Sequence, residues 1–215
     1  MKAIQFPCAL AALSVVAAFS SVPAQAVSTS YYLDQSNINS LPGGTSYLKV
    51  DITSTIAGTA SFSVTPVYAF TQLSNFGIQA FGFNFSGANL SAITTGDFSL
   101  PSGWTAGLPP PSAMDGFGKY DFTVQTTGSG RLNPLTFTVT GLGGATSADT
   151  LGYFAKLSSG GGTHEFFAVH LADFQSGSAT SAYFAGSAPV PEPETYAMLL
   201  AGLGLVGFAA RRKRG

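Results

Sequence analysis

Hydrophobic and polar residues alternate through the middle of the chain, in short runs separated by Gly, Ser, Pro and Asn. In one such run, Leu48, Val50 and Ile52 alternate with Lys49 and Asp51. Alternation with a period of two over five to eight residues predicts half-buried β-strands. The sequence predicts strands within the runs 47–53, 60–66, 78–85, 119–126, 135–141, 151–157, 165–171 and 182–187.

Eight or more short strands with frequent turn signals predict an all-β fold, an antiparallel β-sandwich or jelly roll. No stretch away from the termini keeps a helical period for ten residues. A body of about 160 residues is long enough for one core, and no internal repeat divides it. The core is expected to be mostly aromatic, with Phe62, Phe81, Phe83, Phe85, Phe122, Phe137, Phe154 and Phe167 as its leading candidates.

Two other stretches of the body have their own composition. Residues 102–118 contain three consecutive prolines, which exclude a central strand and predict a loop that closes one end of the sandwich. Residues 179–190 are mostly small and predict a linker. The β-sandwich itself is therefore assigned to residues 27–178.

Charge is scarce in the body and concentrated at the chain ends. Residues 27–190 contain four Lys or Arg and eight Asp or Glu, a net charge of about −4. Nucleic-acid-binding domains carry a basic surface patch, so a nucleic-acid partner is not expected. Disordered chains combine low hydrophobicity with high net charge, so this body is predicted to fold as a neutral extracellular domain.

The N-terminus has the pattern of a secretory signal peptide. Lys2 supplies the positive start, residues 9–19 the apolar core, and Ala24 and Ala26 the small positions of a signal peptidase site. We therefore expect a signal helix over residues 1–26, removed after Ala26. Phe6 and Pro7 precede Cys8, where a lipoprotein would need small residues. Cys8 is the single cysteine, so the processed chain can form no disulfide.

The C-terminus combines an apolar run with a basic end. Residues 196–210 carry no charge, and as a helix they would span roughly 22 Å, short of a hydrocarbon core of about 30 Å. Arg211, Arg212, Lys213 and Arg214 follow, a stop-transfer group expected to stay on the cytoplasmic side. The sequence therefore predicts a short transmembrane helix, with the body outside the membrane. The alternatives are a temporary span and a plain anchor preceded by a stiff proline linker.

Pro191, Glu192 and Pro193 stand immediately before this segment. Together with the Gly-rich short span and the Arg-rich end, they resemble the PEP-CTERM sorting signal, also labelled the ice-binding protein C-terminal domain. The resemblance covers residues 191–215. It implies an exported protein of a Gram-negative bacterium, cut near the motif by an exosortase and delivered to the cell envelope, the cell surface or the extracellular matrix. It also associates the chain with exopolysaccharide and biofilm.

The body has a fainter likeness of its own. The strings IQAFGFNFSG, LPSGW and FFAVHLADF resemble a recurring PEP-CTERM ectodomain, itself similar in outline to cohesin-like sandwiches. This resemblance brings no catalytic residues with it.

Catalytic and metal-binding patterns are weak. His164 and His170 would lie about 20 Å apart along a strand, too far to share a metal ion. The nucleophile motif Gly-x-Ser-x-Gly does not occur, and a dyad of His170 with Asp173 is disfavoured. The sequence does not reveal whether two acids pair at a glycosidase spacing, and calcium bound by loop acids stays open. The five acids considered are Asp97, Asp115, Asp121, Asp149 and Asp173. We expect no metal and no cofactor.

Two features could contact a ligand. Trp104 could stack on a sugar ring, although a lone Trp in a sandwich more often anchors a loop or fills the core. Thr136, Thr138 and Thr140 form an alternating outward row, which is also ordinary for a sheet surface. Ice recognition would need a larger flat array than these three residues.

The sequence as a whole favours a non-enzymatic exported protein with a structural or adhesive role linked to exopolysaccharide. Signal peptidase, an exosortase and the membrane are the expected partners before processing. The alternative is a secreted carbohydrate-binding module or carbohydrate-active enzyme that works near Trp104 and the acids. Two carboxylates facing one cleft beside Trp104 would favour this alternative.

Overall fold

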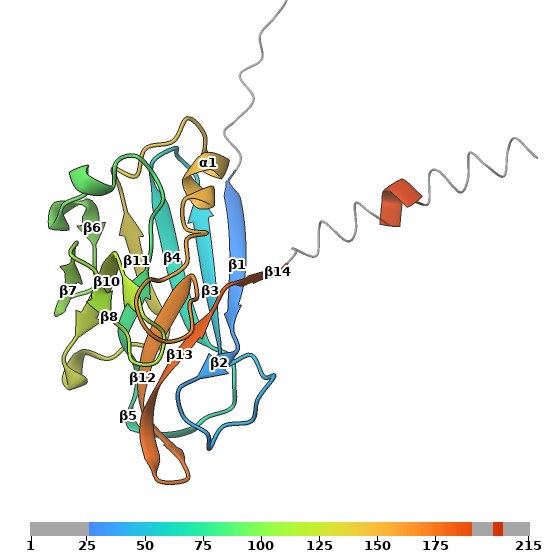
Figure 1. The fold of residues 1–215 in the computed structure, drawn as a ribbon, viewed down its shortest axis with the longest axis vertical. Coiled ribbons are helices and arrows are strands. Elements are labelled where there is room, and N and C mark those ends of the chain that lie inside the picture. Colours follow the sequence, from blue (N-terminus) through green and yellow to red (C-terminus); the bar gives the residue numbers. More distant parts are fainter. Residues whose placement is uncertain (1–25, 191–199, 204–215) are drawn as a thin grey trace, which may run out of the picture.

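Two six-stranded antiparallel sheets pack face to face in the computed structural model of the chain (Figure 1). The structure describes residues 26–190 and 200–203. The first sheet has the strand order β14-β1-β3-β4-β11-β6, and the second has the order β2-β13-β12-β5-β10-β7. A separate hairpin joins β8 and β9. The predicted mostly β, sandwich-like architecture is confirmed.

The strands are β1 Val27–Leu33, β2 Gln35–Ser36, β3 Leu48–Ser54, β4 Ala60–Pro66, β5 Thr71–Phe83, β6 Phe98–Ser99, β7 Trp104–Gly107, β8 Ser112–Ala113, β9 Lys119–Tyr120, β10 Phe122–Thr126, β11 Leu135–Val139, β12 Phe167–Ser176, β13 Ala179–Gly186 and β14 Ala188–Val190. One short helix, α1, covers Ser147–Gly152. The 3₁₀ turns of the described residues cover Leu90–Ala92, Thr95–Asp97 and Gly128–Gly130.

The core forms where the apolar positions of the two sheets meet. In β3 and β4 the alternating side chains are buried, as the sequence pattern predicts. All eight predicted core phenylalanines are buried. Phe62 and Phe137, on neighbouring strands of the first sheet, stack with their ring centroids 4.7 Å apart and an interplanar angle of 3°. Removing such rings from water is the main stabilising contribution to the fold.

The prediction of a strand over 151–157 is wrong. Residues 147–152 form α1, and the rest of the run is a loop. The helix begins with a capping box, in which the Asp149 amide donates to the Thr146 hydroxyl while the Asp149 carboxylate accepts from the Thr146 amide. These bonds satisfy amide groups that a helix start leaves without a partner. The local capping therefore overrides the weak alternation that follows it.

The prediction of a linker over 179–190 is also wrong, whereas the strand predicted within 182–187 is confirmed. Residues 179–186 form β13 of the second sheet, and residues 188–190 form β14 at the edge of the first sheet. Small side chains fit in β13 because other side chains pack closely against this strand. Ala182 and Ala185, for example, are buried against neighbouring strands.

Residues 102–118 do not simply close one end of the sandwich. The segment contains the edge strand β7 and the short strand β8, with the three prolines between them. Beyond the prolines, Met114, Phe117 and Tyr120 pack on Ala168 and Ala185, on the outer face of the second sheet. This loop therefore covers part of a sheet face.

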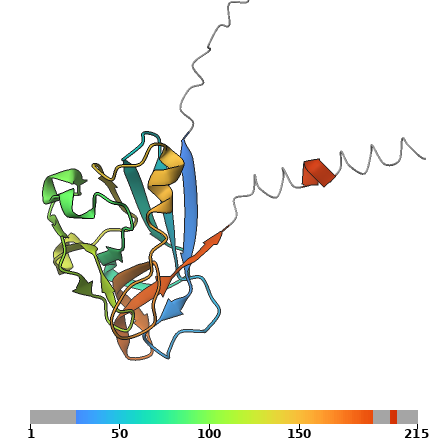
Figure 2. The same cartoon turned by 45° about the horizontal axis from the view of Figure 1, so that its top comes forward.

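The two ends of the sandwich differ. At the upper end in Figure 1, α1 lies beside the start of β1, close to the turn that joins β3 to β4; Figure 2 shows the same grouping from a tilted view. The β12–β13 turn lies at the lower end. Residues 200–203 are helical, and Leu200 and Leu203 are exposed. Within the described part of the chain, no helix has the length and apolar character of a membrane span.

Candidate functional site

The outer face of the first sheet is the leading candidate for a ligand surface. Successive side chains of a strand point to opposite faces of the sheet, so every second residue faces outward. In β4 and β11 the outward residues are almost all Ser or Thr. The strand register then aligns them across the sheet. Thr138 lies opposite Ser61 on one side and Ser99 on the other, and Ser61 in turn lies opposite Thr53. The row of Thr residues predicted on β11 is therefore one column of a wider array.

We call this array the hydroxyl face. It consists of exposed or half-exposed side chains from β1, β3, β4, β6 and β11: Ser28, Ser30, Thr53, Ser61, Ser63, Thr65, Ser99, Thr136 and Thr138. One ion pair lies among them, between Lys49 Nζ and an Asp51 Oδ1 2.7 Å away. The Ser30 hydroxyl also donates to Asp51. The face is therefore nearly neutral and rich in groups that both donate and accept hydrogen bonds.

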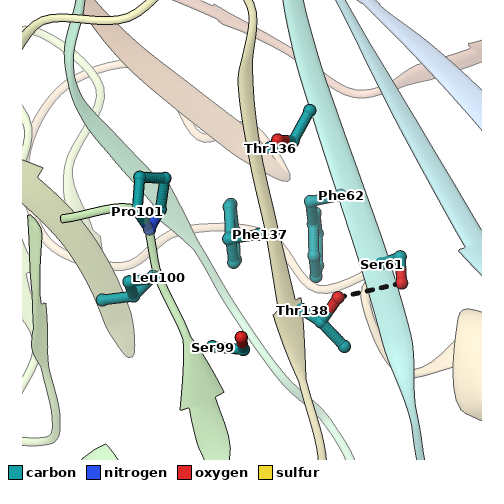
Figure 3. A pocket seen from close by; sticks show the side chains of 8 residues that line it. All are labelled: Ser61, Phe62, Ser99, Leu100, Pro101, Thr136, Phe137 and Thr138. Carbon is teal, nitrogen blue, oxygen red and sulfur yellow. Dashed lines mark hydrogen bonds between the residues drawn. The ribbon is translucent and has the colours of Figure 1, made fainter.

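A shallow groove of about 530 Å³ crosses the hydroxyl face between β4, β11 and β6 (Figure 3). Ser61, Thr136 and Thr138 line one side, and Leu100 with Pro101 forms the other. The hydroxyls of Ser61 and Thr138 are hydrogen-bonded to each other at 3.0 Å. Phe62 and Phe137 lie between these residues and complete the lining. Such a groove offers hydroxyl groups beside apolar carbons.

The groove exists because β6 is short. This strand pairs with β11 only at Thr138 and Val139, and Pro101 follows two residues after its end. Proline has no N–H to continue a ladder. The flank of β11 at Thr136 is therefore left open beside Pro101.

Trp104 is not part of this surface. Its side chain is only 6% exposed and belongs to the main core cluster. Its indole N–H donates to the carbonyl of Gly130 at 2.9 Å. The ring therefore anchors the loop after β10, which favours the core alternative over sugar stacking.

The two histidines lie in different environments. His164 is exposed in the loop before β12, where its Nε2 lies 2.8 Å from the Gly160 carbonyl. His170 lies on β12, half-buried, and stacks on Tyr183 with ring centroids 4.5 Å apart. Burial lowers the pKa of His170, and the nearby charge of Arg131 lowers it further. In the described part of the chain, no three His, Cys, Asp or Glu side chains group closely enough to hold a metal ion.

Each of the five acids considered from the sequence has its own local contact. Asp97 and Asp149 accept hydrogen bonds from Thr94 and Thr146 at the starts of short helical turns. Those bonds lower the pKa of Asp97. Asp121 pairs with the Lys156 ammonium at 2.6 Å. Asp115 accepts from the Asn37 side-chain amide at 3.2 Å, and Asp173 accepts from the Asn75 backbone N–H. The acids therefore serve five separate local contacts.

Three buried polar side chains, Asn84, Tyr120 and Glu165, lie outside the hydroxyl face. The Asn84 side-chain nitrogen is buried without a hydrogen-bond partner among the described residues, and the Tyr120 hydroxyl is buried close to the Ser158 side chain. Burial raises the pKa of Tyr120 well above its ordinary value. Glu165, nearby and also buried, accepts a hydrogen bond from Gln35. These groups are closed off from solvent and are not part of an open site.

The C-terminal edge of the fold is the second functional region. The chain crosses from β13 in the second sheet to β14 in the first at Gly186, where a Cβ atom would stand 2.2 Å from the Tyr32 carbonyl oxygen. β14 then pairs antiparallel with β1, with Pro189 opposite Tyr31. Proline has no N–H, so Pro189 cannot donate to this ladder, and its neighbours Ala188 and Val190 pair with Tyr32 and Ser30. Proline at an edge also discourages addition of another strand.

The predicted processing residues lie mostly beyond the described chain. Ala26 is exposed and directly precedes β1. Ala24, the motif Pro191 to Pro193, the stop-transfer group Arg211 to Arg214 and most of the predicted span over 196–210 lie outside the described residues. The sequence interpretation missed that β14 leads directly into this motif. It also missed Ser61, Ser99 and Pro101 of the groove, which become neighbours only through strand register.

Comparison with known protein families identifies one motif. Residues 189–214 match the PEP-CTERM protein-sorting motif. The motif marks the chain as an exported protein that an exosortase sorts, of the kind that Gram-negative bacteria deliver to the cell surface. Comparisons with curated proteins and with solved structures gave no match. The likeness of the body to cohesin-like sandwiches therefore stays a prediction.

Proposed function

We propose that the folded domain is a non-enzymatic, adhesive module of the cell surface or extracellular matrix that contacts exopolysaccharide through the hydroxyl face. The observation that carries this proposal is the aligned array of Ser and Thr hydroxyls with the groove between Thr138 and Pro101. Polysaccharides present many hydroxyl groups and apolar C–H patches. A neutral surface of hydroxyls beside apolar carbons can match both kinds of group.

Two observations support a non-enzymatic role over the alternative of a carbohydrate-active enzyme. The five acids considered above hold separate local contacts, whereas glycoside hydrolysis needs two carboxyl groups about 5–9 Å apart on one site. Trp104, the expected sugar-stacking residue, is buried and hydrogen-bonded. No specific observation favours the enzyme, so it is not proposed as a second function.

Binding of the processed protein to exopolysaccharide purified from the producing strain tests the proposal. We expect co-sedimentation with the polymer, weakened about tenfold in the double variant Thr136→Val/Thr138→Val. Valine keeps the shape and strand preference of threonine and removes only the hydroxyl. The matched control is Thr105→Val/Thr180→Val, two exposed threonines of the second sheet, which should bind like the wild type. Equal binding by both double variants, or no binding by the wild type, would refute the role of the hydroxyl face.

A further inference from the structure

An apolar groove of about 450 Å³ opens at the upper end of the sandwich, where β1 begins. It lies between the start of β1, the β3–β4 turn and the start of α1. Its lining contains no charged residue and consists of Val27, Thr55, Ile56, Ala57, Ala145, Thr146, Ser147 and Ala148. We call this end of the domain the β1 end.

Ile56 projects from the β1 end. Its side chain is 68% exposed, a high value for a large apolar residue. The turn that carries it is held from both sides, since the Ile56 carbonyl accepts from the Ser54 hydroxyl at 3.0 Å and from the Thr59 amide at 3.1 Å. The Gly58 amide also donates to the Thr150 hydroxyl of α1 at 2.9 Å. The exposure of Ile56 is therefore built into the turn.

Both segments that are directed to the membrane leave the domain beside this end. The signal peptide ends at Ala26, and the next residue, Val27, already lines the groove. At the other terminus, β14 runs antiparallel to β1, so that Val190 lies opposite Ser30 and the chain direction points toward Val27.

The connection to the apolar tail is short. From Val190 to Tyr196, where the uncharged run begins, six residue steps span at most about 20 Å. About 10 Å of this distance is needed to pass from the level of Ser30 to that of Val27. Where the chain continues in the direction of β14, a tail inserted in the membrane leaves at most about 10 Å between the β1 end and the bilayer surface.

We infer that the β1 end is a membrane-contacting surface of the unprocessed protein, with Ile56 and the apolar groove placed in the lipid interface until the tail is cut. This inference rests on the sorting role that the C-terminal motif gives to the tail. The partner is a lipid surface because the groove has an uncharged lining, Ile56 offers apolar area, and the tether brings both to the bilayer. Cutting the tail removes the tether, so the contact ends with processing.

Site-specific fluorescence in vesicles tests the inference. The full precursor, residues 27–215, is purified from cells without exosortase and reconstituted in vesicles of phosphatidylethanolamine and phosphatidylglycerol. It contains no cysteine, so Ile56→Cys and Val67→Cys each accept a single environment-sensitive dye. Val67 is the matched control because it is also apolar and 47% exposed, but follows β4 at the opposite end of the sandwich.

We expect quenchers attached to the lipid to reduce the fluorescence at position 56 at least threefold more than at position 67. Ala148→Cys, across the groove from Ile56, should behave like Ile56→Cys and provides a second probe. Equal quenching at the two ends, in precursor that floats with the vesicles, would overturn the inference and leave the proposed function intact. Precursor that does not float with the vesicles would contradict the sorting role of the tail as well.

Discussion

Pro189 of β14 lies directly opposite Tyr31 of β1, so the sorting motif, matched from residue 189, begins inside a sheet of the folded domain. Only Val190 separates this paired proline from Pro191, the first residue of the motif Pro191 to Pro193. The edge of the first sheet therefore leads into the sorting signal without a free linker. This arrangement depends on how the chain crosses from one sheet to the other.

Gly186→Ala should destabilise the domain by about 1–3 kcal/mol, because the new Cβ atom would overlap the backbone of Tyr32 and Leu33. Urea denaturation measures the change. The matched control is Gly161→Ala, where a Cβ atom would meet no neighbour within 4 Å. If Gly186→Ala is as stable as this control, the crossing at Gly186 is not as tight as described.

Trp104→Phe should cost roughly 1 kcal/mol of folding free energy through loss of the hydrogen bond to Gly130, while Trp104→Ala should cost about 3–5 kcal/mol through the cavity it leaves. Thermal unfolding measures both losses. Because the ring is buried, Trp104→Phe should bind exopolysaccharide like the wild type. A variant with unchanged stability and lost binding would instead make Trp104 a ligand contact.

Asp173 adopts the left-handed backbone region, with φ of 64°, and its carboxylate accepts a hydrogen bond from the Asn75 amide. Asp173→Ala loses this bond and keeps the unfavourable backbone, so we expect a destabilisation of about 1–2 kcal/mol. Asp173→Asn is the matched control, because asparagine tolerates the same backbone and still offers an acceptor oxygen. Equal stabilities of these two variants in urea would contradict the stabilising role of the Asp173 carboxylate.

His170 should make the stability of the domain depend on pH. Burial and Arg131 lower its pKa in the folded state below the ordinary value of 6.5, so the unfolded chain binds the proton more readily. The stabilising contribution is complete above pH 6.5 and is lost as the pH falls from there through the folded-state pKa. The unfolding midpoint should therefore drop over this window in the wild type.

The control for this pH dependence is His170→Gln, which removes the titrating group and keeps a polar side chain beside Tyr183. Its unfolding midpoint should change less over the same pH window. An equal drop in both proteins would show that other groups cause the acid sensitivity.

The sequence predicted the core well because burial follows a local pattern. Apolar residues at every second position must face one side of a strand, so the phenylalanines of β4, β5 and β11 could be assigned inward without the structure. The short helix α1 could not be assigned in this way, since its signal lies in two capping residues, Thr146 and Asp149, and not in a periodic pattern.

The candidate surfaces were harder to predict because they depend on pairing between distant segments. The Thr row on β11 was visible in the sequence, but its alignment with Ser61 and Ser99 depends on strand register. The pairing of β14 with β1 joins the last strand of the domain to the first. The small residues that precede β14 resemble a linker in the sequence. Local alternation indicates which face of a strand is buried, but it does not indicate which distant strand pairs with it.

Intact mass of the processed protein, from strains with and without exosortase, is the decisive test of the sorting role of the tail. We expect the processed chain to begin at Val27 in both strains. It should end near Pro191 to Pro193 only in the strain that has exosortase. Retention of Arg211 to Gly215 in both strains would contradict this role, because the tail would then be a plain membrane anchor and not a sorting signal.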